Sequence, residues 1–140
     1  MEQNKALNYL ALGKRGRLVE LGEEPVGAVA RAVKARLIIV ASDASDHTWR
    51  RAKSFVAGTE QQCLRVPFTK EEMGFVVGRT SLAIAAFTDA ALALAFVKAL
   101  PDQQKVQPEL QKLEEKSKRL KQRKDEAKAH QRNVRMGKKK

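Results

Sequence analysis

Residue types that define whole classes of protein are scarce in this 140-residue chain. Its single cysteine, Cys63, excludes an internal disulfide and, without further cysteines, a thiolate metal cluster. No apolar run approaches the roughly 20 residues that cross a bilayer, and the start MEQNKALNYL lacks the basic and apolar regions of a signal peptide. The sequence therefore predicts a cytoplasmic protein without a disulfide framework, a metal centre or a membrane segment.

Enzyme signatures are absent as well. The chain contains no GxGxxG, Walker P-loop, GxSxG or HExxH motif. His130 lies near the C-terminus, so a catalytic histidine would have to be His47, acting with Asp43 or Asp46 in a small hydrolase. The adjacent carboxylates Glu23-Glu24 point in different directions on a helix and fit an ordinary helix start. We predict a protein that is not an enzyme and needs no cofactor.

Positive charge is abundant and unevenly distributed. The chain has 28 Lys and Arg against 16 Asp and Glu, a net charge of +12. Residues 1–100 carry 14 basic and 10 acidic side chains, net +4, whereas residues 101–140 carry 14 and 6, net +8. Such an excess favours a polyanionic partner, either a nucleic acid or a membrane surface. All seven aromatic residues precede residue 100, which predicts a globular domain over 1–100 and a basic tail, helical or disordered, over 101–140.

Helical and strand patterns alternate along the predicted domain. Helical spacing of apolar residues occurs around Leu7, Val29 and Phe96. Continuous apolar runs at 37–41 and 82–87 predict strands covered on both faces, and shorter strands are expected at 18–21 and 63–66. This order predicts a three-layer α/β/α sandwich, in which helices cover both faces of a central sheet.

Several helix boundaries have physical markers. Acidic residues and a proline at 23–25 fit a first helical turn, because acids meet the positive end of the helix dipole there. Thr69 and Glu72 have the spacing of a capping box, for a short helix that Gly74 or Gly78 ends. The helix that carries Trp49 is capped by an acceptor at position 43 or 45. In the tail, good helix formers start around residue 108, with an apolar stripe too interrupted for a coiled coil.

Basic residues cluster beside glycines. Lys14, Arg15 and Arg17 bracket two glycines just before the first short strand, and Lys34 with Arg36 follows the second helix. Gly22 opens that helix and leaves backbone N–H groups free for anionic oxygens. A polar loop at 78–81 is expected on the same side of the sheet as this helix start. The two segments together are a candidate nucleic-acid surface.

The same residues resemble a known family. The matching segments are Leu12–Val19, Gly22-Glu23-Glu24, Lys34–Ser45, Val66–Gly74 and Val77-Gly78-Arg79. They resemble the ribosomal protein L-seven-Ae / L-thirty-e superfamily, and look most like its bacterial YlxQ-type branch. The resemblance covers about residues 5–100 and does not include the tail. It implies an α/β/α sandwich with a small mixed sheet, and RNA binding without catalysis.

In the superfamily's kink-turn binders, a GxNExxK motif opens the second helix, and a loop before the last strand covers a flipped-out base. Gly22 matches the first glycine, whereas Glu24, Pro25 and Ala28 replace the asparagine, glutamate and lysine. Glu24 still accepts hydrogen bonds from guanine, but Pro25 removes a donor and a carboxylate, and Ala28 removes a cation. Splayed RNA remains the expected target, because side chains cannot read the deep groove of an A-form helix.

The resulting hypothesis is a ribosomal-protein-like RNA-binding protein whose basic tail adds attraction to phosphates. The candidate RNA-binding residues are Lys14, Arg15, Arg17, Gly22, Glu23, Glu24, Lys34, Arg36, Gly78, Arg79 and Thr80. The expected partners are ribosomal or other structured RNA, with the ribosome or translation and transcription factors, and no membrane. The alternative is a protein-interaction module that docks on such a factor and has lost its RNA motif. A tail that only increases solubility is the simpler alternative for residues 101–140.

Overall fold

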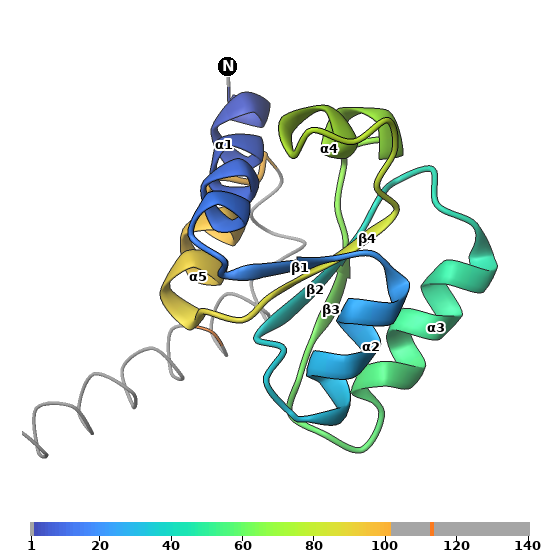
Figure 1. The fold of residues 1–140 in the computed structure, drawn as a ribbon. Helices are drawn as coiled ribbons and strands as arrows, with labels where there is room; N and C mark the ends of the chain where they lie inside the picture. The colour runs from blue at the N-terminus through green and yellow to red at the C-terminus, as the bar shows by residue number, and fades with distance from the viewer. Residues whose placement is uncertain (1, 102–112, 114–140) are drawn as a thin grey trace, which may run out of the picture.

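A four-stranded mixed sheet forms the centre of the computed structural model, which describes residues 2–101 and 113 (Figure 1). In spatial order its strands are β1 (Val19–Leu21), β4 (Ile84–Phe87), β2 (Leu37–Val40) and β3 (Cys63–Arg65). β4 is antiparallel to both β1 and β2, and β2 is parallel to β3. Every residue of the two central strands is buried, as expected for apolar runs covered on both faces.

Five helices cover the two faces of the sheet. α1 (Glu2–Arg15) packs against α5 (Ala90–Lys98) and α4 (Lys70–Val76). On the opposite face, α2 (Glu23–Arg31) packs against α3 (Asp46–Val56) (Figure 1). This arrangement confirms the predicted α/β/α sandwich with a small mixed sheet. None of the helices in the described residues is long and apolar enough to span a bilayer.

The last strand is shorter than its apolar run predicts. β4 begins at Ile84, so Leu82 and Ala83 belong to the preceding loop. The N–H of Leu82 donates to the carbonyl of Lys70 at 2.9 Å, which uses the backbone group that a strand would offer to a neighbour. Leu82 is nevertheless 2% exposed, so its apolar side chain reflects packing in the core and not pairing in the sheet.

The two candidate caps of α3 have different roles. The hydroxyl of Ser45 accepts a hydrogen bond from the N–H of Thr48 at 3.2 Å and is the N-cap. The carboxylate of Asp43 accepts instead from the N–H of Lys70 at 2.8 Å. Asp43 therefore joins the loop after β2 to the first residue of α4.

The capping box of α4 is confirmed. The N–H of Glu72 donates to the Thr69 hydroxyl at 3.1 Å, and the Glu72 carboxylate accepts from the N–H of Thr69 at 2.9 Å. The helix ends at Val76 and is followed by Gly78, whose φ of 77° is in the left-handed region. Gly74 lies within the helix, so Gly78 is the terminating glycine of the two predicted.

The hydrophobic core includes one side chain from beyond residue 100. Phe87 and Phe96 lie with ring centroids 5.0 Å apart at its centre. Leu113 is completely buried in the same apolar cluster. The division at residue 100 stays a prediction, and apart from Leu113 the predicted tail helix and its stripe lie outside the described residues.

Truncation of Leu113 tests whether this side chain stabilises the domain. We expect Leu113→Ala to lower the free energy of unfolding by about 2–5 kcal/mol, the usual range for a buried leucine. The matched control is Leu12→Ala, because Leu12 is 48% exposed and should lose less than about 1 kcal/mol. Urea denaturation of the full chain measures both values. Equal losses in the two variants would contradict the burial of Leu113.

Candidate nucleic-acid interface

Gly22 connects the end of β1 to the start of α2. Its φ of 97° lies in the region that favours glycine. Its N–H donates to the carbonyl of Ile84, the first residue of β4, at 3.0 Å. Because loop residues 77–83 lead directly into Ile84, the start of α2 lies beside this loop.

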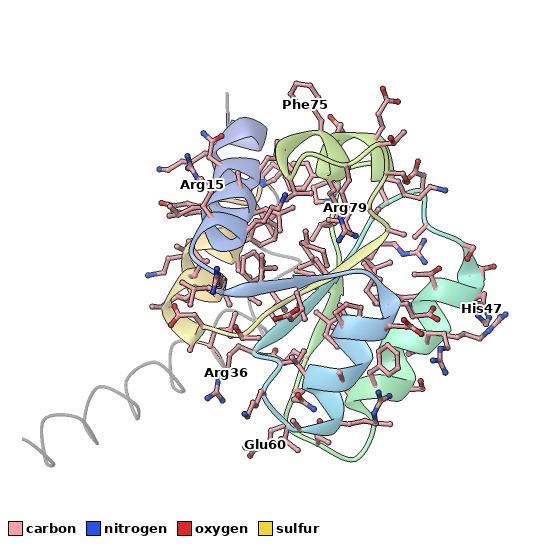
Figure 2. The ribbon with its side chains drawn as sticks, viewed as in Figure 1. Arg15, Arg36, His47, Glu60, Phe75 and Arg79 are labelled. Carbon is pink, nitrogen blue, oxygen red and sulfur yellow. The ribbon has the colours of Figure 1, made fainter. Side chains whose placement is uncertain are left out.

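Arg79 spans the space between the two segments. One terminal nitrogen of its guanidinium lies 3.6 Å from the position that a Cβ would take at Gly22, and Figure 2 places the side chain between α4 and α2. The loop around Arg79 is held against α4, because the Arg79 N–H donates to the Gly74 carbonyl at 2.8 Å. A Cβ at Gly74 would lie 2.8 Å from both the Arg79 carbonyl oxygen and the Ser81 nitrogen, so this close approach requires glycine. The two segments that we predicted to be neighbours therefore meet.

Lys14 reaches the same loop from the last turn of α1. Its Nζ donates to the carbonyl of Val77 at 2.6 Å across a partly buried contact. The same atom lies 3.7 Å from the position that a Cβ would take at Gly78. A charged donor on a neutral carbonyl gives a strong hydrogen bond, so Lys14 holds the loop and does not act only as a charge on the surface.

The two acidic residues at the start of α2 have different surroundings. The Glu23 carboxylate lies 3.7 Å from the Arg51 guanidinium, with both side chains more than 40% exposed. That guanidinium also lies 4.9 Å from the centroid of the Phe55 ring. Glu24 is exposed and has no cation within 4 Å in the described part of the chain. Arg51 thus offsets one of the two negative charges near Gly22.

Sequence reasoning did not single out Arg51 or Phe55. Together with Glu23, Glu24 and other residues of α2 they line a small hollow of about 280 Å³ between α2 and α3. The run Arg50-Arg51 was a visible signal. Its relation to α2 depends on how the two helices pack and has no marker in the sequence.

Lys34 and Arg36 lie at the other end of the sheet from this site. The N–H of Arg36 donates to the carbonyl of Phe87 at 2.7 Å, whereas Gly22 bonds to Ile84 at the opposite end of β4. Three residue steps along a strand span about 10 Å. Figure 2 shows Arg36 and Arg79 well separated. The structure therefore does not bring the basic pair at 34 and 36 together with Gly22 and Arg79.

The remaining basic candidates also spread apart. Arg17 precedes Leu18, whose carbonyl accepts from the N–H of Thr88 at 2.9 Å, so Arg17 lies near the Phe87 end of the sheet. Figure 2 shows Arg15 on the side of α1 away from Arg79. Thr80 is exposed and follows Arg79 in its loop. The loop before β4 thus joins Lys14, Gly78, Arg79 and Thr80, and Arg79 connects this loop to Gly22, Glu23 and Glu24 at the start of α2.

The hydrolase alternative finds little support in the geometry. His47 is exposed on the first turn of α3 and points away from the body of the domain (Figure 2). Asp43 uses its carboxylate on the N–H of Lys70. The described residues contain no group of three His, Cys, Asp or Glu side chains that could hold a metal ion.

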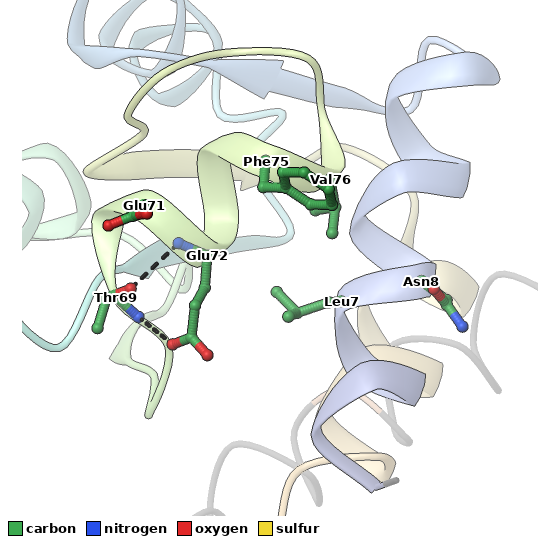
Figure 3. A pocket seen from close by; sticks show the side chains of 7 residues that line it. All are labelled: Leu7, Asn8, Thr69, Glu71, Glu72, Phe75 and Val76. Atoms are coloured by element: carbon green, nitrogen blue, oxygen red, sulfur yellow. Dashed lines mark hydrogen bonds between the residues drawn. The ribbon is translucent and has the colours of Figure 1, made fainter.

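A second hollow lies between α1 and α4. It has a volume of about 800 Å³, and Leu7, Asn8, Thr69, Glu71, Glu72, Phe75 and Val76 line it (Figure 3). Phe75 is 82% exposed, the most exposed large apolar side chain in the described residues. Two carboxylates line this hollow. That of Glu72 accepts the hydrogen bond of the capping box, whereas that of Glu71 has no part in the capping box.

Comparison with solved structures places the fold in a known class. A protein of unknown function from Bacillus halodurans C superposes with a TM-score of 0.64 at 22% identity, covering 70% of this chain and 98% of that one. A Giardia lamblia 15.5kD RNA-binding protein superposes with a TM-score of 0.57 at 16% identity, covering 70% and 83% of the two chains. At these identities the likeness concerns the fold alone. No family model matches the chain.

A sequence relative defines the family more narrowly. The RNA-binding protein YlxQ of Enterococcus faecium is 31% identical over 77 residues, which span 55% of this chain and 74% of the relative. The chain therefore belongs to the YlxQ-type branch of the L-seven-Ae / L-thirty-e superfamily, which confirms the resemblance noted from the sequence.

The loop contact of Lys14 gives a testable prediction. We expect Lys14→Met to release the Val77 carbonyl and to reduce protection of the Arg79 amide about tenfold, because a hydrogen bond to a charged group contributes about 1.5 kcal/mol. Hydrogen exchange measured by NMR reports this amide directly. Arg15→Met is the matched control, since Arg15 is exposed on the same turn and should leave the amide unchanged. Unaltered Arg79 exchange in Lys14→Met would exclude the positioning role.

Proposed function

We propose that this chain is a non-enzymatic, cytoplasmic RNA-binding protein that contacts structured RNA through the start of α2 and the loop before β4. The main support is the guanidinium of Arg79 beside Gly22, 3.6 Å from the position of a Cβ there. The names of the Enterococcus and Giardia proteins, both described as RNA-binding, support the same class of ligand. The RNA is ribosomal or kink-turn-like in this proposal.

The start of α2 suits a phosphate group. α3, α4 and α5 each begin with a side chain that caps a backbone N–H, from Ser45, Thr69 and Asp89. α2 begins at Gly22 without a side-chain cap. Its first N–H groups, at Glu23 and Glu24, are therefore available to an anionic oxygen, with the positive end of the helix dipole behind them. The Arg79 guanidinium adds a full positive charge beside them.

The bases are not read here in the manner of a GxNExxK motif. Glu24, Pro25 and Ala28 are all exposed at the start of α2. They stand where that motif has the amide of asparagine, the carboxylate of glutamate and the ammonium of lysine, and none of them supplies the group of its position. The exposed Glu24 carboxylate repels phosphates and cannot donate a hydrogen bond, but it accepts from base N–H groups and ribose hydroxyls. We infer that preference among RNAs comes from shape and phosphate positions, together with what this carboxylate accepts.

A second candidate function is docking on a protein such as a translation or transcription factor. The observation that favours it is Phe75, 82% exposed beside the hollow between α1 and α4. Exposed aromatic side chains are frequent anchors of protein interfaces. Complexes isolated from cell extract distinguish the two functions, because nuclease treatment removes partners held through RNA and keeps those held through Phe75.

Charge removal at one residue tests the RNA site. We expect Arg79→Gln to weaken binding to the preferred structured RNA about tenfold, because the lost cation lies beside Gly22. The ratio of the affinities for this RNA and for an unstructured RNA should decrease as well. Lys34→Gln removes an equal charge at the far end of the sheet and should change affinity less than twofold. Fluorescence anisotropy at fixed salt gives both affinities. Equal effects of the two substitutions would refute the proposed site.

The contribution of the tail needs a truncation that keeps the core intact. Ending the chain after Ser117 retains Leu113 and removes eleven basic and two acidic residues, a net +9. We expect this variant to bind all RNAs more weakly, with a shallower dependence on salt, and to keep its order of preference among RNAs. A melting curve confirms that the domain stays folded. Loss of the preference itself would show that the tail provides the specificity.

A further inference from the structure

Two cationic side chains lie over the ring of Trp49 on α3. The guanidinium carbon of Arg65, on β3, is 5.2 Å from the centroid of the Trp49 ring. The ammonium of Lys53, one turn further along α3, is 6.0 Å from the same centroid. Trp49 is half-buried, and both cations are exposed. We refer to Trp49, Lys53 and Arg65 as the α3–β3 patch.

The charges of this patch are not neutralised. In the described part of the chain no carboxylate lies within 4 Å of Lys53 or Arg65, and the ion pair that the domain does form joins Arg51 to Glu23. A cation–π contact stabilises the position of a cationic head group without cancelling its charge. The ring therefore limits the rotamers of both side chains, so less entropy is lost when an anion binds them.

The register of the sheet places this patch at the same end as the candidate site. Arg65, the last residue of β3, pairs with Val40, and Val40 pairs with Ile84 on β4. Ile84 accepts the hydrogen bond from Gly22. Three strand spacings thus separate Gly22 from Arg65, a distance of about 14 Å that a few stacked nucleotides span.

We propose that the α3–β3 patch is a further contact for RNA phosphates. It binds the part of the RNA strand that continues beyond the start of α2. This inference rests on the proposed RNA-binding function and extends its footprint across the end of the sheet. RNA is favoured over an acidic protein because the patch lies at the same end of the sheet as Arg79 and Gly22. A single polyanion that crosses the end of the sheet meets both groups of cations.

Trp49 is the only tryptophan of the chain, so its emission reports this patch alone. The full chain is titrated with an end-labelled RNA hairpin that carries an internal loop and a single-stranded extension. We expect the Trp49 emission to change with the same midpoint as the anisotropy of the label. The double variant Lys53→Gln/Arg65→Gln should show little Trp49 response to RNA.

Salt dependence gives a second, quantitative readout. Each lost contact to single-stranded phosphate lowers the slope of log affinity against log salt by about 0.7, so the double variant should lose about 1.4. Between about 50 and 200 mM salt, wild-type affinity should then fall about sevenfold more than that of the variant. The matched control Lys34→Gln/Arg36→Gln removes two cations at the opposite end of the sheet and should keep the wild-type slope.

The outcomes separate this inference from the function on which it rests. If no RNA changes the anisotropy, the proposed RNA-binding function itself fails. If RNA binds but Trp49 emission stays constant, or both double variants lose the same slope, the patch is not an RNA contact and the function stands. A Trp49 response to a poly-glutamate peptide, with none to bound RNA, would overturn the inference in favour of an acidic protein partner.

Discussion

The antiparallel pairing of β4 with both β1 and β2 is the constraint that positions the functional surface. This pairing places the first residue of β4, Ile84, beside the end of β1, where its carbonyl accepts from Gly22 at 3.0 Å. The loop before β4 must then pass the start of α2, and Arg79 lies in that loop. Every residue of β2 and β4 is buried between the helical layers, so packing on both faces of the sheet holds the arrangement.

Basic residues of one chain acquire different roles from their surroundings. Lys14 donates to the Val77 carbonyl and positions a loop, and Arg51 offsets Glu23 while lying over Phe55. Arg79 faces the uncapped start of α2, and Arg65 lies against the ring of Trp49. A net charge of +4 over residues 1–100 describes none of these differences. What distinguishes the residues is which backbone group, carboxylate or ring lies within reach.

In the proposed function, residues 1–100 and the predicted tail contribute in different ways, because the positive charge is unevenly distributed between them. Residues 101–140 carry a net charge of +8. Such a charge suits attraction to RNA phosphates, which does not depend on the RNA sequence. The described domain positions few cations, but holds them on helices and strands where preference among RNAs can arise. Leu113 ties the two parts together, because its side chain is completely buried in the core of the domain.

The fold class, the element order and the capping box of α4 were predictable from the sequence, because they depend on periodicity and on contacts between residues close in the chain. Asp43 and Ser45 were indistinguishable as caps, because only the packed structure brings the N–H of Lys70 to Asp43. Likewise, the basic clusters at 14–17 and 34–36 were equivalent in sequence. In the structure Lys14 reaches the loop before β4, whereas Arg17 and Arg36 lie near the Phe87 end of the sheet, opposite Ile84 and Gly22. By itself the sequence determined the kinds of element and the total charge. The tertiary structure decided which charges share a surface, because strand order and register join residues that are far apart in the chain.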